Sequence, residues 1–293
     1  MLFVGCAAAR PTHLLERSVA GGEGLECRAF VAWNHEPVRD AFLVINGSGT
    51  LSNAFVHRTL EGLLKARHVA YATYDKPGVF ARFGDPQAVK RDDARLERYT
   101  LGHGTQCAIE ALHLLRAQLG PQVRLHVRAH SEGTLVALYA YDELLAHEPE
   151  LASRIATFVL SGLPVEPLGV IVDRQLEKMP DGASMRAAFA ACDWQALEPR
   201  MGVSCAWLED AKRRPSGREM FERLAAQRVP ARFVVFHGTE DWHAPVAAVR
   251  ELEVWNAAHG HLAIDFHYHE GGHQGSDAAR AEVEKLFGML APD

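Results

Sequence analysis

The pattern of apolar and polar residues changes along the chain. Two alternating segments, 13–21 and 25–33, flank Gly-Gly-Glu-Gly and predict an antiparallel hairpin. From Ala41 onward, short runs of Val, Ile, Leu and aromatic residues alternate with amphipathic segments. This is typical of an α/β fold with a mostly parallel sheet covered by helices on both faces. The expected strands are 41–46, 69–75, 123–129, 155–162, 231–238 and 262–270, and the expected helices are 52–67, 94–119, 134–146, 245–258 and 276–289.

One connection is much longer than the others. Nearly seventy residues separate Gly162 from Pro230, which is far more than a normal crossover needs. Large apolar residues recur in it at helical spacings: Met179, Met185, Phe189, Trp194, Trp207 and Phe221. The pattern predicts a helical lid inserted into the sheet domain at 163–229.

Composition limits the functional classes. The 293 residues are 48% hydrophobic, enough for one large domain or two small ones. The 31 Lys and Arg against 37 Asp and Glu give a net charge of -6, and the basic residues are scattered. This argues against nucleic acid or an anionic membrane surface as partner. No run of 18 apolar residues predicts a membrane span, and the oligomeric state stays open.

The N-terminus and the cysteines bear on localisation. MLFVGCAAARP is similar to the end of a bacterial lipoprotein signal, but it lacks the charged and apolar regions of one. The expected tail is therefore 1–13 of a cytoplasmic protein, and the alternative is an envelope lipoprotein anchored at Cys6 if the natural start lies upstream. The other four cysteines form no zinc or CxxC spacing and are expected to be mostly buried thiols, with a pairing of Cys192 and Cys205 left open: Cys27, Cys107, Cys192 and Cys205.

The stretch LVINGSGT, 43–50, follows an expected strand and can serve either a phosphate or an oxyanion. A dinucleotide site needs a third glycine where Ser52 stands, and Asp75 lies 26 positions after Gly49 rather than about 20. The hairpin before Ala41 would also lie outside such a unit. The oxyanion alternative predicts a nucleophile at a later strand-to-helix turn.

Such a turn is present in AHSEG, 129–133, between an expected strand and a strongly periodic helix. A serine at this turn has its side chain pushed outward, and small neighbours let strand and helix approach. The helix N-terminus also favours developing negative charge. Ser131 is therefore the candidate nucleophile.

Together, NGSG at 46–49, YDKPGV at 74–79 and AHSEG resemble the serine α/β-hydrolase superfamily, most of all its bacterial esterase-type members with YDKRGVG and GHSEG patterns. The resemblance runs from about residue 25 to the C-terminus. It implies a core of 14–162 and 230–293 around the inserted lid, and no cofactor. Ala129 replaces the first glycine of GxSxG, and Pro77 and Phe80 replace the Arg and second Gly of YDKRGVG. The loop after that strand is therefore expected to have a different shape.

The superfamily order of serine, acid and histidine implies the other catalytic groups. Asp241, in the loop after the strand that follows the lid, is the expected acid, with Glu240 as the alternative. His273, in the glycine-rich loop after the last strand, is the expected base. His267 and His269 share one face of that strand and are expected to pack there. A zinc site made by them and a loop histidine is a weaker alternative, and we expect no metal.

The resemblance also gives the glycine loop a role. The backbone N–H groups of Glu132 and Ser48 are the expected oxyanion donors. Gly47 and Gly49 shape the supporting loop, which Asn46 braces.

The expected function is hydrolysis of a small carboxylic ester or thioester through an acyl-serine intermediate, with an apolar acyl pocket in the lid. A serine aminopeptidase or acyltransferase is the first alternative. An aminopeptidase would need acidic groups at the entrance, for which Asp181, Glu209 and Asp210 are candidates. A non-catalytic binding protein and a nucleotide-dependent oxidoreductase are weaker alternatives.

Overall fold

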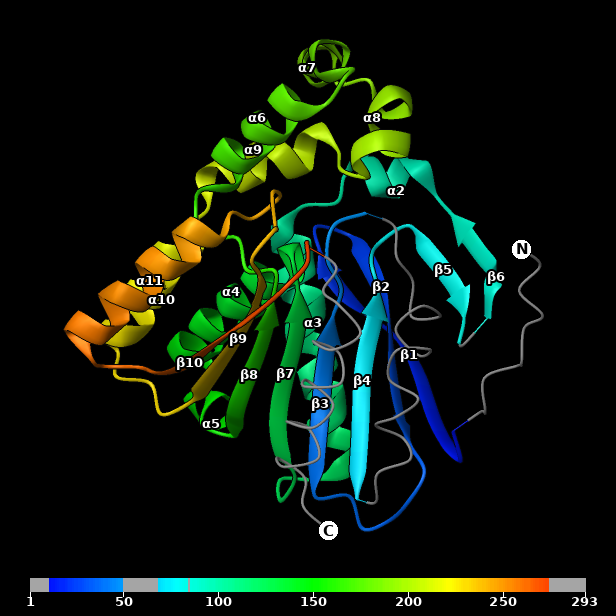
Figure 1. Ribbon diagram of the computed structural model, residues 1–293. Helices are drawn as coiled ribbons and strands as arrows, with labels where there is room; N and C mark the ends of the chain where they lie inside the picture. Colours follow the sequence, from blue (N-terminus) through cyan, green and yellow to red (C-terminus); the bar gives the residue numbers. More distant parts are fainter. Residues whose placement is uncertain (1–10, 50–67, 84, 274–293) are drawn as a thin grey trace.

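The computed structural model describes residues 11–49, 68–83 and 85–273. Its main element is an eight-stranded sheet in the order β1-β2-β4-β3-β7-β8-β9-β10 (Figure 1). β2 runs antiparallel to both of its neighbours, and all other pairs are parallel. The strands are β1 (His13–Gly22), β2 (Leu25–Trp33), β3 (Asp40–Ile45), β4 (Val69–Asp75), β7 (Arg124–His130), β8 (Ile155–Ser161), β9 (Arg232–Gly238) and β10 (Ala263–His269). The expected mostly parallel sheet and N-terminal hairpin are confirmed.

The central strands are apolar runs because both of their faces are covered. Every residue of β3 and of β4 is buried. Helix α4 (Glu132–His147) is buried over most of its surface, and it contacts β3 and β7 as well as α3 (Leu101–Leu119). The core therefore lies between the sheet and these helices. The expected helices 52–67 and 276–289, and Cys6 in the expected tail, lie outside the described residues.

The segment after β4 differs from the expectation of a loop followed by one helix over 94–119. It forms a second hairpin, β5 (Val79–Arg82) and β6 (Asp85–Arg91), and then the short helix α2 (Asp93–Glu97). α3 begins only after a capping box, in which the Thr100 hydroxyl accepts the His103 N–H and the His103 ring accepts the Thr100 N–H. This cap ends one helix and starts the next.

The long connection between β8 and β9 is helical. Four of its helices lie together beyond one end of the sheet in Figure 1: α6 (Leu168–Lys178), α7 (Gly182–Ala191), α8 (Trp194–Met201) and α9 (Cys205–Arg213). The next helix, α10 (Gly217–Ala226), instead packs beside α4, and its Phe221 meets Phe233 of β9 edge-on. The short α5 (Pro149–Ala152) and α11 (Val246–His259) complete the helices of the described residues. None of the described helices is both long enough and apolar enough to cross a bilayer.

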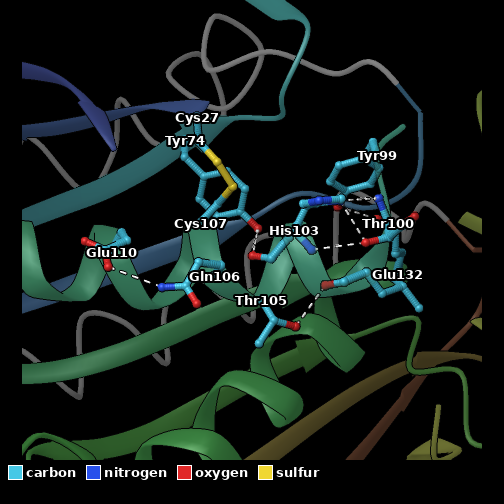
Figure 2. Close-up of a disulfide and its surroundings, with 12 residues drawn as sticks. Cys27, Tyr74, Tyr99, Thr100, His103, Thr105, Gln106, Cys107, Glu110 and Glu132 are labelled. Atoms are coloured by element: carbon cyan, nitrogen blue, oxygen red, sulfur yellow. Dashed lines mark hydrogen bonds between the residues drawn. A yellow bond between two sulfur atoms is a disulfide. The ribbon is translucent and has the colours of Figure 1, made fainter. Parts of the chain in front are cut away.

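The cysteines correct the expectation of buried thiols. Cys27 of β2 is bonded to Cys107 of α3, close to Tyr74 (Figure 2). Cys192 is bonded to Cys205, which ties the end of α7 to the start of α9. Their Cα–Cα distances of 6.0 and 5.5 Å are ordinary for disulfides. The Cys192–Cys205 bond is the pairing that the sequence left open. Sequence spacing does not reveal the Cys27–Cys107 pair because its partners meet only in the fold.

The two disulfides are expected to contribute unequally to stability. The Cys27–Cys107 bond spans 80 residues and the Cys192–Cys205 bond spans 13. Chain entropy gives upper values of about 4.5 and about 3 kcal/mol for loops of these lengths. The double Ala variant of the first pair should therefore lose more unfolding free energy in urea than the double Ala variant of the second. Equal losses, or no loss in either variant, would contradict this ranking.

Candidate active site

The site is built around a strained turn. Ser131 lies between the end of β7 and the start of α4 with φ 54° and ψ -127°, a backbone conformation that is costly for a residue with a side chain. The Ser131 N–H donates to the Ser161 carbonyl at 2.8 Å, and the Thr134 hydroxyl donates to the Ser131 carbonyl at 2.7 Å. These bonds hold the turn from both sides.

Glycines allow the turn to lie against the end of β3. A Cβ on Gly133 would lie 2.5 Å from the Asn46 carbonyl oxygen and 2.7 Å from that of Ile45. A Cβ on Gly47 would lie 2.9 Å from the Ser131 Cβ. The 46–49 loop therefore lies directly beside Ser131.

Three loops bring Ser131, His273 and Asp241 together. His273 Nε2 lies 2.7 Å from Ser131 Oγ, and His273 Nδ1 lies 2.7 Å from Asp241 Oδ2. The place of the imidazole depends on Gly162, where a Cβ would lie 2.9 Å from His273 Cε1. A hydroxyl, an imidazole and a carboxylate in this chain of hydrogen bonds can move a proton from serine to histidine.

Asp241 is buried and hydrogen-bonded on both oxygens. Its Oδ1 accepts the backbone N–H groups of His243 and Ala244 at 2.9 and 3.0 Å. Burial raises the pKa of this carboxyl, but the hydrogen bond and charge of His273, the Ala244 N–H and His237 together hold the pKa below its usual value. Asp241 is therefore ionised and fixes His273 with Nδ1 as the donor.

Three further histidines lie close to Asp241 and His273. Burial and the charge of His273 lower the pKa of His130 to about 4, and the same two causes lower the pKa of His243. Burial also lowers the pKa of His237, which donates to the Ala244 carbonyl at 2.7 Å. These rings stay neutral near pH 7 and do not compete with His273 for a proton.

The alternative residues lie elsewhere. Glu240 is exposed, and its N–H donates to the Gly271 carbonyl. His267 stacks on Phe236, which confirms the expected packing, and His269 Nδ1 donates to the Glu270 carbonyl.

The described residues contain one group that could hold a metal ion. Asp241, His243 and His273 each offer a ligand atom, and these atoms lie within 4.8 Å of one another. Two of the three residues already share the hydrogen bond that leads to Ser131. The expected HxH pair is not part of this group.

A cavity of about 460 Å³ opens over Ser131. Gly47, Ser48, His130, Glu132 and His273 form its polar end. Mostly apolar side chains from the helices after β8 and from the loop after β9 form the rest: Leu168, Ile171, Val172, Met179, Met201, Val203, Trp207 and Trp242, together with Gln175 and Arg200. The cavity therefore suits a small molecule with an apolar part and a polar reacting group.

Comparison with known proteins identifies the fold. No protein-family model matches the sequence, and no curated protein matches it. Among solved structures, a highly thermostable carboxyl esterase from Bacillus coagulans aligns at a TM-score of 0.60 and 14% identity, over 94% of this chain and 97% of its own. A hydrolase from Pseudomonas aeruginosa aligns at a TM-score of 0.58 and 18% identity, over 95% of this chain and 98% of its own. A puromycin-hydrolyzing peptidase from Mycobacterium tuberculosis aligns at a TM-score of 0.61 and 14% identity, over 98% of this chain and 40% of its own.

The chain has the α/β-hydrolase fold. These identities are low, so the likeness concerns the fold alone. Within that fold, Ser131, Asp241 and His273 follow β7, β9 and β10 in the order expected from the sequence.

The acidic residues expected for an aminopeptidase entrance are all paired with basic side chains. Asp181 pairs with Arg200, Glu209 with Lys212 and Asp210 with Arg214: the distances are 3.3, 3.5 and 2.8 Å. None of the three acids lines the cavity, although Arg200, the partner of Asp181, does.

Sequence reasoning missed one polar cluster. Lys76, Tyr99 and the Glu132 side chain meet in the interior, directly behind the Ser131 turn. Lys76 belongs to YDKPGV and Glu132 to AHSEG, so both lie in motifs that the sequence singles out. A lysine after a strand is normally exposed, which is why its burial was not expected.

The neutral His130 predicts a pH dependence of stability. Its folded pKa of about 4 lies below its ordinary value of 6.5, so the unfolded chain binds this proton more tightly. Its contribution should be fully present above pH 6.5 and should be lost as the pH falls toward 4, by up to about 3 kcal/mol. In urea titrations across this range, His130→Asn should show a flatter loss of unfolding free energy than wild type. Parallel curves would contradict the assignment.

Proposed function

We propose that the protein is a serine hydrolase that cleaves carboxylic esters or thioesters through an acyl-serine intermediate. The observation that carries the proposal is the continuous hydrogen-bonded chain from Ser131 Oγ through His273 to the buried Asp241 carboxylate. The apolar cavity over Ser131 and the esterases and hydrolases among structures with the same fold support it.

In this mechanism, Ser131 Oγ attacks the ester carbonyl while His273 Nε2 accepts its proton. Asp241 stabilises the imidazolium that forms. The N–H groups of Ser48 and Glu132 bind the oxyanion of the tetrahedral intermediate. His273 then protonates the departing alcohol or thiol, and a water molecule activated by His273 releases the acid from Ser131.

We further propose that 163–229 is a lid and that its α6–α9 part holds the acyl group. Leu168, Ile171, Val172 and Trp207 of these helices are buried side chains that line the cavity. Apolar contacts of this kind favour an acyl chain over a charged or strongly polar group.

The nucleophile is tested by labelling with a fluorophosphonate probe. Wild type should be labelled rapidly at Ser131, Ser131→Ala should not be labelled, and His273→Ala should be labelled at least 1,000-fold more slowly because the base is lost. Ser204→Ala, which removes a buried serine that caps α9, serves as the control and should be labelled like wild type. An unlabelled wild type, or labelling of Ser131→Ala at the wild-type rate, would refute the mechanism.

The acyl pocket is tested with nitrophenyl esters of increasing chain length. Each methylene buried contributes about 0.8 kcal/mol, so kcat/KM should rise up to about fourfold per methylene until the cavity is full. Met179→Trp, which narrows the cavity, should move the optimum to shorter chains. Val170→Trp is the matched control on exposed α6 surface and should leave the optimum unchanged. A flat series in wild type would exclude an apolar acyl pocket.

A further inference from the structure

Lys76 is a buried cation with two oxygen partners. It lies just after β4 with only 5% of its surface exposed. Its Nζ donates to the Gly47 carbonyl at 2.8 Å and to Glu132 Oε1 at 2.9 Å, and it lies 4.9 Å from the centre of the Tyr99 ring. The ammonium therefore joins the 46–49 loop to the first residue of α4.

Glu132 completes this cluster. Its side chain is almost fully buried, and Oε1 also accepts the Tyr99 hydroxyl at 3.2 Å. Burial and the negative charge of Glu132 raise the pKa of Tyr99, so the phenol keeps the proton that it donates. A buried ion pair stabilises a fold little compared with apolar residues of the same volume, because both charges must be desolvated. Stability alone therefore gives little reason for a lysine and a glutamate here.

The peptide that Lys76 contacts supplies a reason. The Gly47 C=O and the Ser48 N–H belong to one planar trans peptide, so they point in opposite directions. Fixing the carbonyl on Lys76 fixes the direction of the Ser48 N–H as well. Ser48 lines the cavity over the proposed nucleophile together with Ser131 and Glu132.

We propose that Lys76 and Glu132 are positioning residues that orient the oxyanion donors. Lys76 holds the Gly47–Ser48 peptide so that its N–H faces the substrate oxygen. Glu132 donates the second N–H from its backbone, and its side chain holds the Lys76 ammonium in place. This inference rests on the proposed hydrolase function, because the donors matter only if an oxyanion forms at Ser131.

The decisive variant is Lys76→Met combined with Glu132→Gln, which removes both charges while nearly conserving shape. Its melting temperature should lie close to that of wild type, whereas Lys76→Met alone should melt lower because it leaves Glu132 buried without its cation. For a nitrophenyl ester, kcat of the double variant should fall roughly 10-fold to 1,000-fold with KM within about threefold, because the lost interaction is made in the transition state. Affinity for a boronic acid inhibitor, whose adduct mimics the tetrahedral intermediate, should fall in parallel.

Asp40→Asn is the matched control. Asp40 is a buried carboxylate at the opposite end of β3, roughly 17 Å along the strand from the loop, where it pairs with His126 and Arg124. This variant should melt at a lower temperature and keep kcat. If the Lys76–Glu132 pair had a purely structural role, variants of this pair would also melt at a lower temperature and keep kcat.

A second variant covers the case in which the double variant does not fold. The side chain of Lys76→Gln is one atom shorter and uncharged, so its amide cannot hold the Gly47 carbonyl as the ammonium does. Its kcat should fall at least tenfold, and its melting temperature should fall less than that of Lys76→Met because a polar amide still faces the buried Glu132 carboxylate. Unchanged kcat in a folded Lys76→Gln or double variant, while wild type hydrolyses the ester and is labelled at Ser131, overturns the positioning role alone. A wild type that is neither active nor labelled overturns the proposed function and this inference with it.

Discussion

The turn at Ser131 constrains the rest of the site. Its positive φ turns the chain from β7 into α4, which starts against the end of β3, where Gly133 leaves room for the Ile45 and Asn46 carbonyls. β3 and β7 are paired neighbours near the centre of the sheet although about eighty residues separate them in sequence. The sheet order therefore places the 46–49 loop beside the turn, and the absence of a side chain on Gly47 lets the two make contact. The position of the Ser131 hydroxyl therefore depends on both the strand order and these two glycines.

Two pairs of charged or ionisable groups lie on different sides of this turn. Asp241 and His273 form one, and Lys76 and Glu132 form the other. Each group is held by a hydrogen bond to its partner, and the histidines around Asp241 have lowered pKa values and remain neutral. In the proposed mechanism the Asp241–His273 pair transfers the proton, and the Lys76–Glu132 pair orients the backbone N–H donors.

The sequence predicts what is encoded locally. The strand expected at 69–75 matches β4 because a strand buried on both faces is a mostly apolar run without polar alternation. β6 was missed because DPQAVKR contains a proline and charged residues in place of apolar alternation. The order of Ser131, Asp241 and His273 follows from the resemblance, but the partners of Lys76 do not. These partners come from the 46–49 loop and α4, which only the fold brings to the end of β4. The Cys27–Cys107 disulfide likewise joins segments that meet only in the fold.

The segment between β8 and β9 also contacts the 46–49 loop, whose Gly47 carbonyl Lys76 binds. Gly202, just after α8, has φ +63°, and a Cβ there would lie 2.7 Å from the Gly49 Cα. Met201 and Val203 on either side of it line the cavity. The wall that would hold an acyl chain is therefore continuous with the backbone that would stabilise the oxyanion. A displacement of α8 would move both the cavity wall and the 46–49 backbone, because a packed interior transmits strain rather than absorbing it. In the proposed mechanism, chain-length selectivity and turnover are thus coupled through the contact between Gly202 and Gly49.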